Sequence, residues 1–264
     1  AAPALLRGLL DGDHGIRWVH VMGTGIDQFP VHLVKRAQLS CSRGATAIPI
    51  AEWAMAMLLA RAKQLPDSWV EQPPAEWFMA PLSMLAGKTL GLVGYGTIGQ
   101  AIATRARAFD MDVQALVRRP RQVEPGGVRF VDDIAALMAS SDCVVLAAPA
   151  TAATHHLINA ESLAAARPGM HLVNVARGSL VEEAALRVAL DEERIGMGSL
   201  DVVEDEPLAA NHWMYSHPRV QLSARVSWNS PTAFSNMILY FVRNLRHFSN
   251  GEPLDGLVDI NAGY

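Results

Sequence analysis

Three glycines at fixed spacing are the residues of this sequence whose chemistry can be read most directly. Gly94, Gly96 and Gly99 follow the apolar run at residues 90–93 and open a stretch with helical periodicity, with Thr97 and Ile98 between the last two. The first glycine permits a tight turn, the second lets a diphosphate approach the backbone, and the third lets helix and strand pack closely. N–H groups at the start of a helix also favour an anionic ligand. We expect these five residues to hold the diphosphate of a nicotinamide dinucleotide.

The end of the next apolar run bears on which dinucleotide is bound. A carboxylate about 20 residues after such a turn usually accepts a hydrogen bond from the adenosine 2′-hydroxyl. Here Val117 occupies that place and is followed by Arg118 and Arg119, whose guanidinium groups can bind a 2′-phosphate. The sequence therefore favours NADP(H). NAD(H) is the alternative if the two arginines are only solvated loop charges.

Short apolar runs alternate with helical patterns from residue 90 to residue 203. Continuously apolar strands separated by helices indicate a parallel sheet with both faces covered. We predict an α/β fold in which residues 61–232 form a doubly wound parallel sheet of Rossmann type. The expected strands lie at residues 90–94, 113–117, 143–149, 171–176 and 198–203.

A second, smaller α/β domain is expected to bind the substrate. It would comprise residues 1–60 and 233–264, joined to the sheet by a buried apolar helix at residues 50–62 and a helix that begins at Ser230–Pro231 and ends at Asn250–Gly251. The chemistry would lie in the cleft between the two domains. Residues 64–83 contain four prolines and predict an extended arm or linker.

Composition narrows the class of protein. Half of the 264 residues are hydrophobic (50%) and 18% are charged, which suits a large core. A net charge of −4 argues against a nucleic-acid partner, and no run reaches the roughly 18 apolar residues of a membrane span. Cys41 and Cys143 show neither disulfide nor metal spacing. We expect a cytoplasmic protein with no metal site.

Four segments in order resemble the D-isomer-specific 2-hydroxyacid dehydrogenase family, in particular its glyoxylate and hydroxypyruvate reductases. They are GLVGYGTIG at 91–99, NVARGSLVEEAAL at 174–186, LDVVEDEP at 200–207 and the ending GLVDINAGY. The resemblance implies an NAD(P)-dependent oxidoreductase that acts on a small 2-oxo or 2-hydroxy acid, and a homodimer formed through the nucleotide domain. It begins partway into the family's substrate domain, which suggests a fragment or a reduced small domain.

The resemblance also implies roles for individual residues. Arg177 would bind the substrate carboxylate and the reacting carbonyl, and Glu206 would hold the proton donor. The substrate would also contact Gly23, Thr24 and Gly25, and the cofactor would contact Pro149, Val175, Ala176 and Asp201. Ser179 and Glu182 have capping-box spacing and are expected to start the next helix.

One departure from the family pattern concerns the proton donor. Arg225 stands where the family has histidine, and Ala224 stands where it has proline. Arginine cannot act as an acid and base near neutral pH, although it could pair with Glu206 and polarise a carbonyl, so Arg177, Glu206 and Arg225 are the candidate catalytic residues. The alternative is a catalytically silent module of the same fold that senses NADP(H) or binds a protein.

Overall fold

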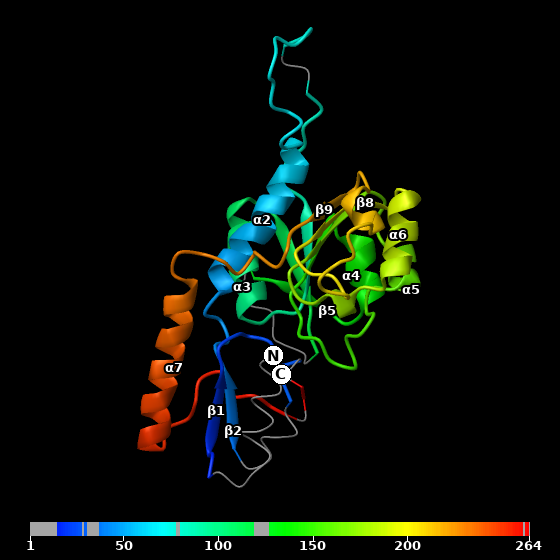
Figure 1. Cartoon of the computed structure of the whole chain (residues 1–264). Coiled ribbons are helices and arrows are strands. Elements are labelled where there is room, and N and C mark those ends of the chain that lie inside the picture. The colour runs from blue at the N-terminus through cyan, green and yellow to red at the C-terminus, as the bar shows by residue number, and fades with distance from the viewer. Residues whose placement is uncertain are drawn as a thin grey trace.

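Seven parallel strands form the main sheet of the computed structural model, which describes residues 15–27, 29–30, 37–77, 80–118, 127–260 and 262–263 (Figure 1). Their spatial order is β5-β4-β3-β6-β7-β8-β9. The strands are β3 (Thr89–Val93), β4 (Asp112–Leu116), β5 (Arg129–Val131), β6 (Cys143–Leu146), β7 (Met170–Asn174), β8 (Ile195–Leu200) and β9 (Val220–Leu222). The order reverses between β3 and β6, where ligands bind in such sheets. The predicted doubly wound fold is confirmed.

Helices cover both faces of this sheet because successive side chains of a strand point to opposite sides. Val145 belongs to one apolar cluster with α2 (Ala47–Lys63) and α3 (Thr97–Ala108). Its neighbour Val144 belongs to a second cluster that contains α4 (Ile134–Ser140), α5 (Ala160–Ala164) and α6 (Glu183–Asp191). The almost entirely apolar sequence of α2 therefore reflects its burial against the large sheet.

The expected cap of α6 is wrong. Ser179 lies in the short 3-10 helix η2 (Gly178–Leu180), whereas α6 begins at Glu183 with Glu182 as its N-cap and without a side-chain capping bond. The turn of η2 places Ser179 too early to reach the first N–H groups of the helix.

A smaller two-stranded parallel sheet contains β1 (Trp18–Val21) and β2 (Gln38–Cys41). Helix α7 (Ala233–Asn250) packs on it, since Trp18 stacks on Phe241 and Phe248 at ring centroid distances of 5.5 and 5.4 Å. Asn244 of α7 is fully buried and forms hydrogen bonds with the backbone of Asp255.

The expected domain boundaries at residues 60 and 233 remain a prediction. None of the described helices is long and apolar enough to cross a membrane.

The segment between α2 and β3 projects from the body of the molecule as an arm (Figure 1). Its described residues, 64–77 and 80–84, include apolar side chains that are largely exposed. Trp69 is 70% exposed, Trp77 66% and Met84 64%. The prolines of this segment had predicted such an extended arm.

Candidate active site

The glycine turn joins β3 to α3 at the point where the strand order reverses. Gly94 has a φ of +96°, and a Cβ there would lie 2.9 Å from the backbone of Ala147 and Ala148. A Cβ on Gly99 would lie 2.4 Å from the carbonyl oxygen of Gly94. Both positions therefore require glycine so that the start of the helix can pack on the strand ends.

Gly96 is the N-cap of α3 and faces open space, with nothing within 4 Å of the position of a Cβ. The first N–H groups of a helix, here those of Thr97, Ile98 and Gly99, have no intrahelical acceptor and point out of the N-terminus. An open cradle of this kind fits a diphosphate. The geometry of these residues agrees with the arrangement expected from the sequence.

The residues expected to determine whether NAD(H) or NADP(H) is bound follow β4. Val117 is half-buried and packs against the cluster that holds α3, and Arg118 is exposed. Arg119 lies outside the described residues. β4 and β3 are adjacent in parallel register, so Val117 and Arg118 lie at the same edge of the sheet as the glycine turn.

The ends of β6 and β7 reach the same edge. Pro149 is exposed, and its carbonyl oxygen accepts a hydrogen bond from the Thr154 hydroxyl at 2.7 Å. Val175 and Ala176 are buried at 6% and 7% exposure. Asn174, for which the sequence suggested no role, stabilises the turn that these two residues form after β7.

The brace uses both ends of the Asn174 amide. Its Oδ1 accepts from the N–H of Ala176 at 3.0 Å, and its Nδ2 donates to the carbonyl oxygen of Arg177 at 2.9 Å. The backbone of Arg177 is thereby held at the end of β7.

The side chain of Arg177 reaches from the large sheet to the loop that follows β1. Its Nε donates to Asp27 Oδ1 at 2.9 Å, and its Nη1 donates to the carbonyl oxygen of Ala176 at 2.7 Å. A Cβ on Gly25 would lie 1.5 Å from Nη2. The structure thus brings Arg177 to the predicted loop of Gly23, Thr24 and Gly25, and a glycine is required for this approach.

Asp27 is a residue that the sequence reasoning missed. The Asp27 and Arg177 side chains are each 25% exposed, so a carboxylate ligand from solvent can still reach the guanidinium. Because Asp27 takes the Nε side, Nη2 remains turned toward Gly25. The two residues are 150 positions apart, and only the neighbouring Gly23 and Gly25 hinted at this loop.

Asp201 organises the loop that carries Arg225. Its carboxylate accepts hydrogen bonds from the Ser223 hydroxyl at 2.5 Å and from the N–H groups of Val226 at 2.8 Å and Ser227 at 3.1 Å. Its carbonyl oxygen accepts from the N–H of Arg225 at 2.9 Å. The side chain is only 2% exposed. Asp201 therefore has a structural task besides the cofactor contact that the resemblance implies.

Arg225 forms an ion pair with Glu206. Arg225 Nη1 donates to Glu206 Oε2 at 2.5 Å, and Glu206 Oε1 accepts from the N–H of Val203 at 3.2 Å. Arg225 has a φ of +54°. The pairing considered from the sequence is thus present, whereas the catalytic roles of Arg177, Glu206 and Arg225 remain predictions.

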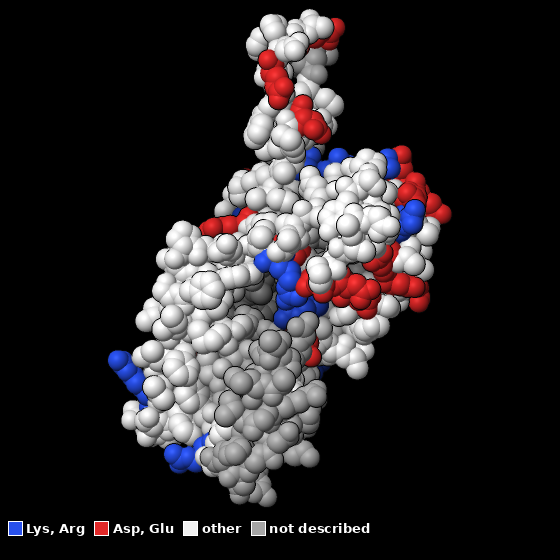
Figure 2. Space-filling view, in the orientation of Figure 1, with Lys and Arg blue, Asp and Glu red and all other residues white. Residues whose placement is uncertain are grey.

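Figure 2 shows basic side chains gathered near the middle of one face beside a band of acidic ones. Two ion pairs of the candidate site join charges of opposite sign, Arg177 with Asp27 and Arg225 with Glu206.

Neither cysteine suits nucleophilic chemistry here. Both are buried, and burial raises the pKa of Cys41 and raises the pKa of Cys143 to about 12.

Comparisons with known proteins agree with this geometry. The NAD binding domain of the D-isomer specific 2-hydroxyacid dehydrogenases matches residues 55–227. A D-3-phosphoglycerate dehydrogenase from Methanocaldococcus jannaschii is 34% identical over 76% of this chain and 40% of its own length. A glyoxylate reductase from Thermococcus onnurineus is 36% identical over 79% of this chain and 65% of its own length. The chain thus spans less than two thirds of either relative.

A solved structure shows the same fold. It is a D-isomer specific 2-hydroxyacid dehydrogenase from Xanthobacter autotrophicus in complex with NADPH and MES, with 26% identity and a TM-score of 0.81 over 95% of this chain and 80% of that chain. The family match runs from the middle of α2 to the loop of Arg225 and contains all seven strands of the large sheet. The chain belongs to the D-isomer specific 2-hydroxyacid dehydrogenase family.

Proposed function

We propose that this chain is an NADPH-dependent reductase that transfers a hydride to a small 2-oxo acid such as glyoxylate or hydroxypyruvate. The observation that carries the proposal is the position of Arg177. Asp27 and the carbonyl oxygen of Ala176 orient its guanidinium, and Nη2 occupies the space that a side chain at Gly25 would fill. A planar fork of donors fixed in this way suits a carboxylate and the adjacent carbonyl oxygen.

The side chains would divide the work between binding and charge stabilisation. Bound NADPH supplies the hydride. Arg177 and the backbone of residues 23–25 hold the carboxylate and fix the carbonyl, and Arg177 stabilises the negative charge that develops on its oxygen. Arg225, oriented by Glu206, adds a second positive charge. Because arginine keeps its protons near neutral pH, the proton that completes the alcohol comes from water.

The preference for NADPH rests on the segment after β4. Val117 offers no carboxylate to repel a 2′-phosphate, and Arg118 is exposed beside it. The related enzyme from Xanthobacter autotrophicus was solved with NADPH. Arg118→Ala is expected to weaken NADPH binding roughly tenfold while leaving NADH binding nearly unchanged. An equal loss for both cofactors would reject this assignment.

Homodimerisation through the nucleotide domain is part of the proposal. The exposed Trp69, Trp77 and Met84 give the arm an apolar surface that a second copy can cover. Light scattering should report a dimer that Trp69→Ser together with Trp77→Ser dissociates.

Two further parts of the proposal concern location and domain organisation. Two free cysteines favour a cytoplasmic location. We also propose that residues 1–60 and 233–264 form the substrate-binding part.

An activity assay with variants at residue 225 tests the catalytic proposal. The wild type should oxidise NADPH faster than NADH with glyoxylate or hydroxypyruvate. Arg225→His should raise the rate by up to about 10²- to 10⁴-fold, the usual contribution of a positioned acid, and should introduce a titration of the rate near the pKa of histidine. Arg219→His is the matched control, because Arg219 also pairs with a glutamate, Glu193, but precedes β9, whereas Arg225 follows it.

The outcomes separate the enzyme from the silent module. Activity in the wild type supports the reductase. An inert wild type with an active Arg225→His variant indicates that the natural chain binds the cofactor without using it. If both proteins are inert while NADPH still binds, the proposed reaction is rejected.

A further inference from the structure

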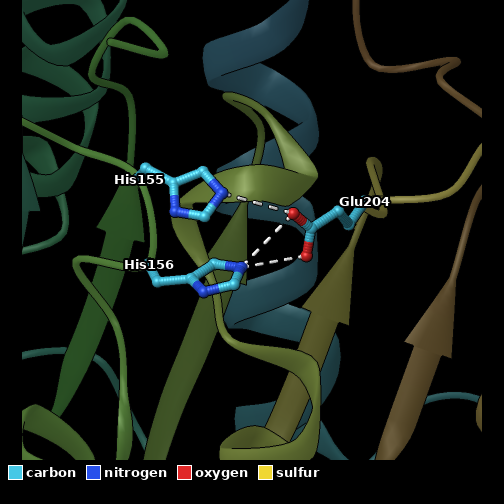
Figure 3. A group of neighbouring side chains, drawn as sticks. All are labelled: His155, His156 and Glu204. Carbon is cyan, nitrogen blue, oxygen red and sulfur yellow. Dashed lines mark hydrogen bonds and ion pairs between the residues drawn. The ribbon is translucent and has the colours of Figure 1, made fainter. Parts of the chain in front are cut away.

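A group of three potential metal ligands lies beside the proposed active site without belonging to it. His155 and His156 lie in the turn after β6, and Glu204 follows β8. Figure 3 shows both imidazole rings turned toward the carboxylate of Glu204. His156 Nε2 lies 3.0 Å from Glu204 Oε2, and His155 Nε2 lies 3.6 Å from Glu204 Oε1. Two histidines therefore converge on one carboxylate.

The spacing of these atoms suits a bound ion. The ligand atoms all lie within 4.8 Å of one another. Metal–ligand bonds of about 2.0–2.2 Å in tetrahedral geometry place neighbouring ligand atoms roughly 3.3–3.6 Å apart. The nitrogen–oxygen distances of 3.0, 3.3 and 3.6 Å bracket this value. A metal ion could enter the group with only small side-chain movements.

The backbone holds the ligands in place before any ion binds. The N–H of His156 donates to the carbonyl oxygen of Ser179 at 2.8 Å, and the N–H of His155 donates to that of Thr151 at 3.0 Å. On the opposite side, a Cβ on Gly178 would lie 2.1 Å from the backbone nitrogen of Glu204. Glycine at this position therefore lets the Glu204 loop approach the turn that anchors His156.

The competing interpretation is that these residues form an ordinary ion pair. Other histidine–carboxylate pairs in the described part of the chain allow a comparison. His212 pairs with Glu183, and His217 pairs with Asp191, each as one histidine with one carboxylate. Within the described residues, the group at Glu204 is the only one with three such ligands. Its side chains are 55%, 35% and 35% exposed, so water can complete the coordination.

We propose that His155, His156 and Glu204 form a binding site for a divalent transition metal ion, with Zn²⁺ as the representative case. Two imidazoles and one carboxylate favour Zn²⁺, Cu²⁺ or Ni²⁺ over Mg²⁺ and Ca²⁺, which prefer oxygen ligands alone. The ion would link the loop after β6 to the loop after β8. The site does not depend on the proposed reductase activity, because none of its three residues contributes to that mechanism. The sequence had predicted no metal site, and Glu204 lies 48 positions after His156.

Calorimetric titration of the tag-free full chain tests the site. After chelator treatment and dialysis, ZnCl₂ should bind with one equivalent per chain, and MgCl₂ should not bind. His155→Ala, His156→Ala and Glu204→Gln should each weaken Zn²⁺ binding at least tenfold. His217→Ala is the matched control, because it removes a histidine from a pair with a single carboxylate, and it should leave Zn²⁺ binding unchanged.

Two results would overturn the proposal: a wild type that does not bind Zn²⁺, and binding that all three variants retain. Circular dichroism checks that each variant is folded. If a variant does not fold, anomalous diffraction at the zinc edge from wild-type crystals decides the question. A peak bridging the three side chains supports the site, and a peak elsewhere or none rejects it.

Discussion

Replacing Asp201 by asparagine tests how the loop of Arg225 is held. The buried carboxylate accepts hydrogen bonds from the Ser223 hydroxyl and from the N–H groups of Val226 and Ser227. In Asp201→Asn one oxygen becomes an NH₂ group, which cannot accept. At least one donor then loses its acceptor in a place that water hardly reaches. The variant should be destabilised, and the side chain of Arg225 should be released from Glu206.

The size of the effect follows from these contacts. A hydrogen bond to a charged group contributes about 1.5–3 kcal/mol, and a buried donor left without a partner costs about 1–3 kcal/mol. We expect the free energy of unfolding to fall by about 2–4 kcal/mol. For a chain of this size each kcal/mol corresponds to roughly 2–4 °C, so the melting temperature should fall by roughly 5–15 °C.

Thermal unfolding followed by circular dichroism measures this change. Ser223→Ala is the control, because it removes one hydroxyl donor and leaves both backbone bonds to Asp201, and it should cost only about 1 kcal/mol. A melting temperature of Asp201→Asn no lower than that of Ser223→Ala would refute the structural reasoning. Unchanged stability with weakened NADPH binding would instead indicate that Asp201 contributes mainly to cofactor binding, as the family resemblance implies.

Three other substitutions have clear expectations. Gly96→Ala should fold normally, because its Cβ meets nothing within 4 Å, but should weaken NADPH binding at least tenfold in fluorescence titration; unchanged binding would remove Gly96 from the diphosphate site. Asp27→Ala should lower kcat/KM for a 2-oxo acid about tenfold, because Arg177 loses the acceptor of its Nε, whereas Asp27→Asn keeps an acceptor and should lose less; equal losses would point to charge rather than orientation. Burial and the nearby Arg61 lower the pKa of His171 to about 3, so its unfolded form binds a proton below pH 6.5 and its folded form does not. The wild type should therefore lose stability as the pH falls from about 6.5 toward 3. Urea unfolding at pH 7 and pH 4.5 measures this loss, and the His171→Gln variant should lose less stability between the two pH values than the wild type. Equal losses in both proteins would contradict the lowered pKa.

Local patterns predicted the nucleotide-binding part of the fold well. Gly94, Gly96 and Gly99 are close in sequence, and their turn depends mainly on neighbouring strands whose apolar runs are easy to recognise. The start of α6 was missed because Ser179 and Glu182 match a capping box by spacing alone. The intervening 3-10 turn is set by the close packing of Gly178 against the loop of Glu204, which no local pattern reveals.

The candidate site was predictable only where a pattern lay within one segment. Arg177 stood out in its segment, but its partner Asp27 lies in the loop after β1 and has no local signal. The pairing of Arg225 with Glu206 could be anticipated, because the resemblance places Arg225 at the position of the proton donor and Glu206 as the residue that holds it. The bonds from Asp201 to residues 223–227 could not, because they depend on how the ends of β8 and β9 meet.

The backbone at Arg225 has a consequence for exchanging this residue. Its φ of +54° lies in the left-handed region, which is unfavourable for most side chains but several-fold enriched in histidine, asparagine and aspartate. Arginine is thus held in a conformation that it seldom adopts, and the N–H bond to the Asp201 carbonyl helps to keep it there. Arg225→His should relieve local strain rather than add to it. The backbone at this position would therefore suit the histidine that the resemblance places there.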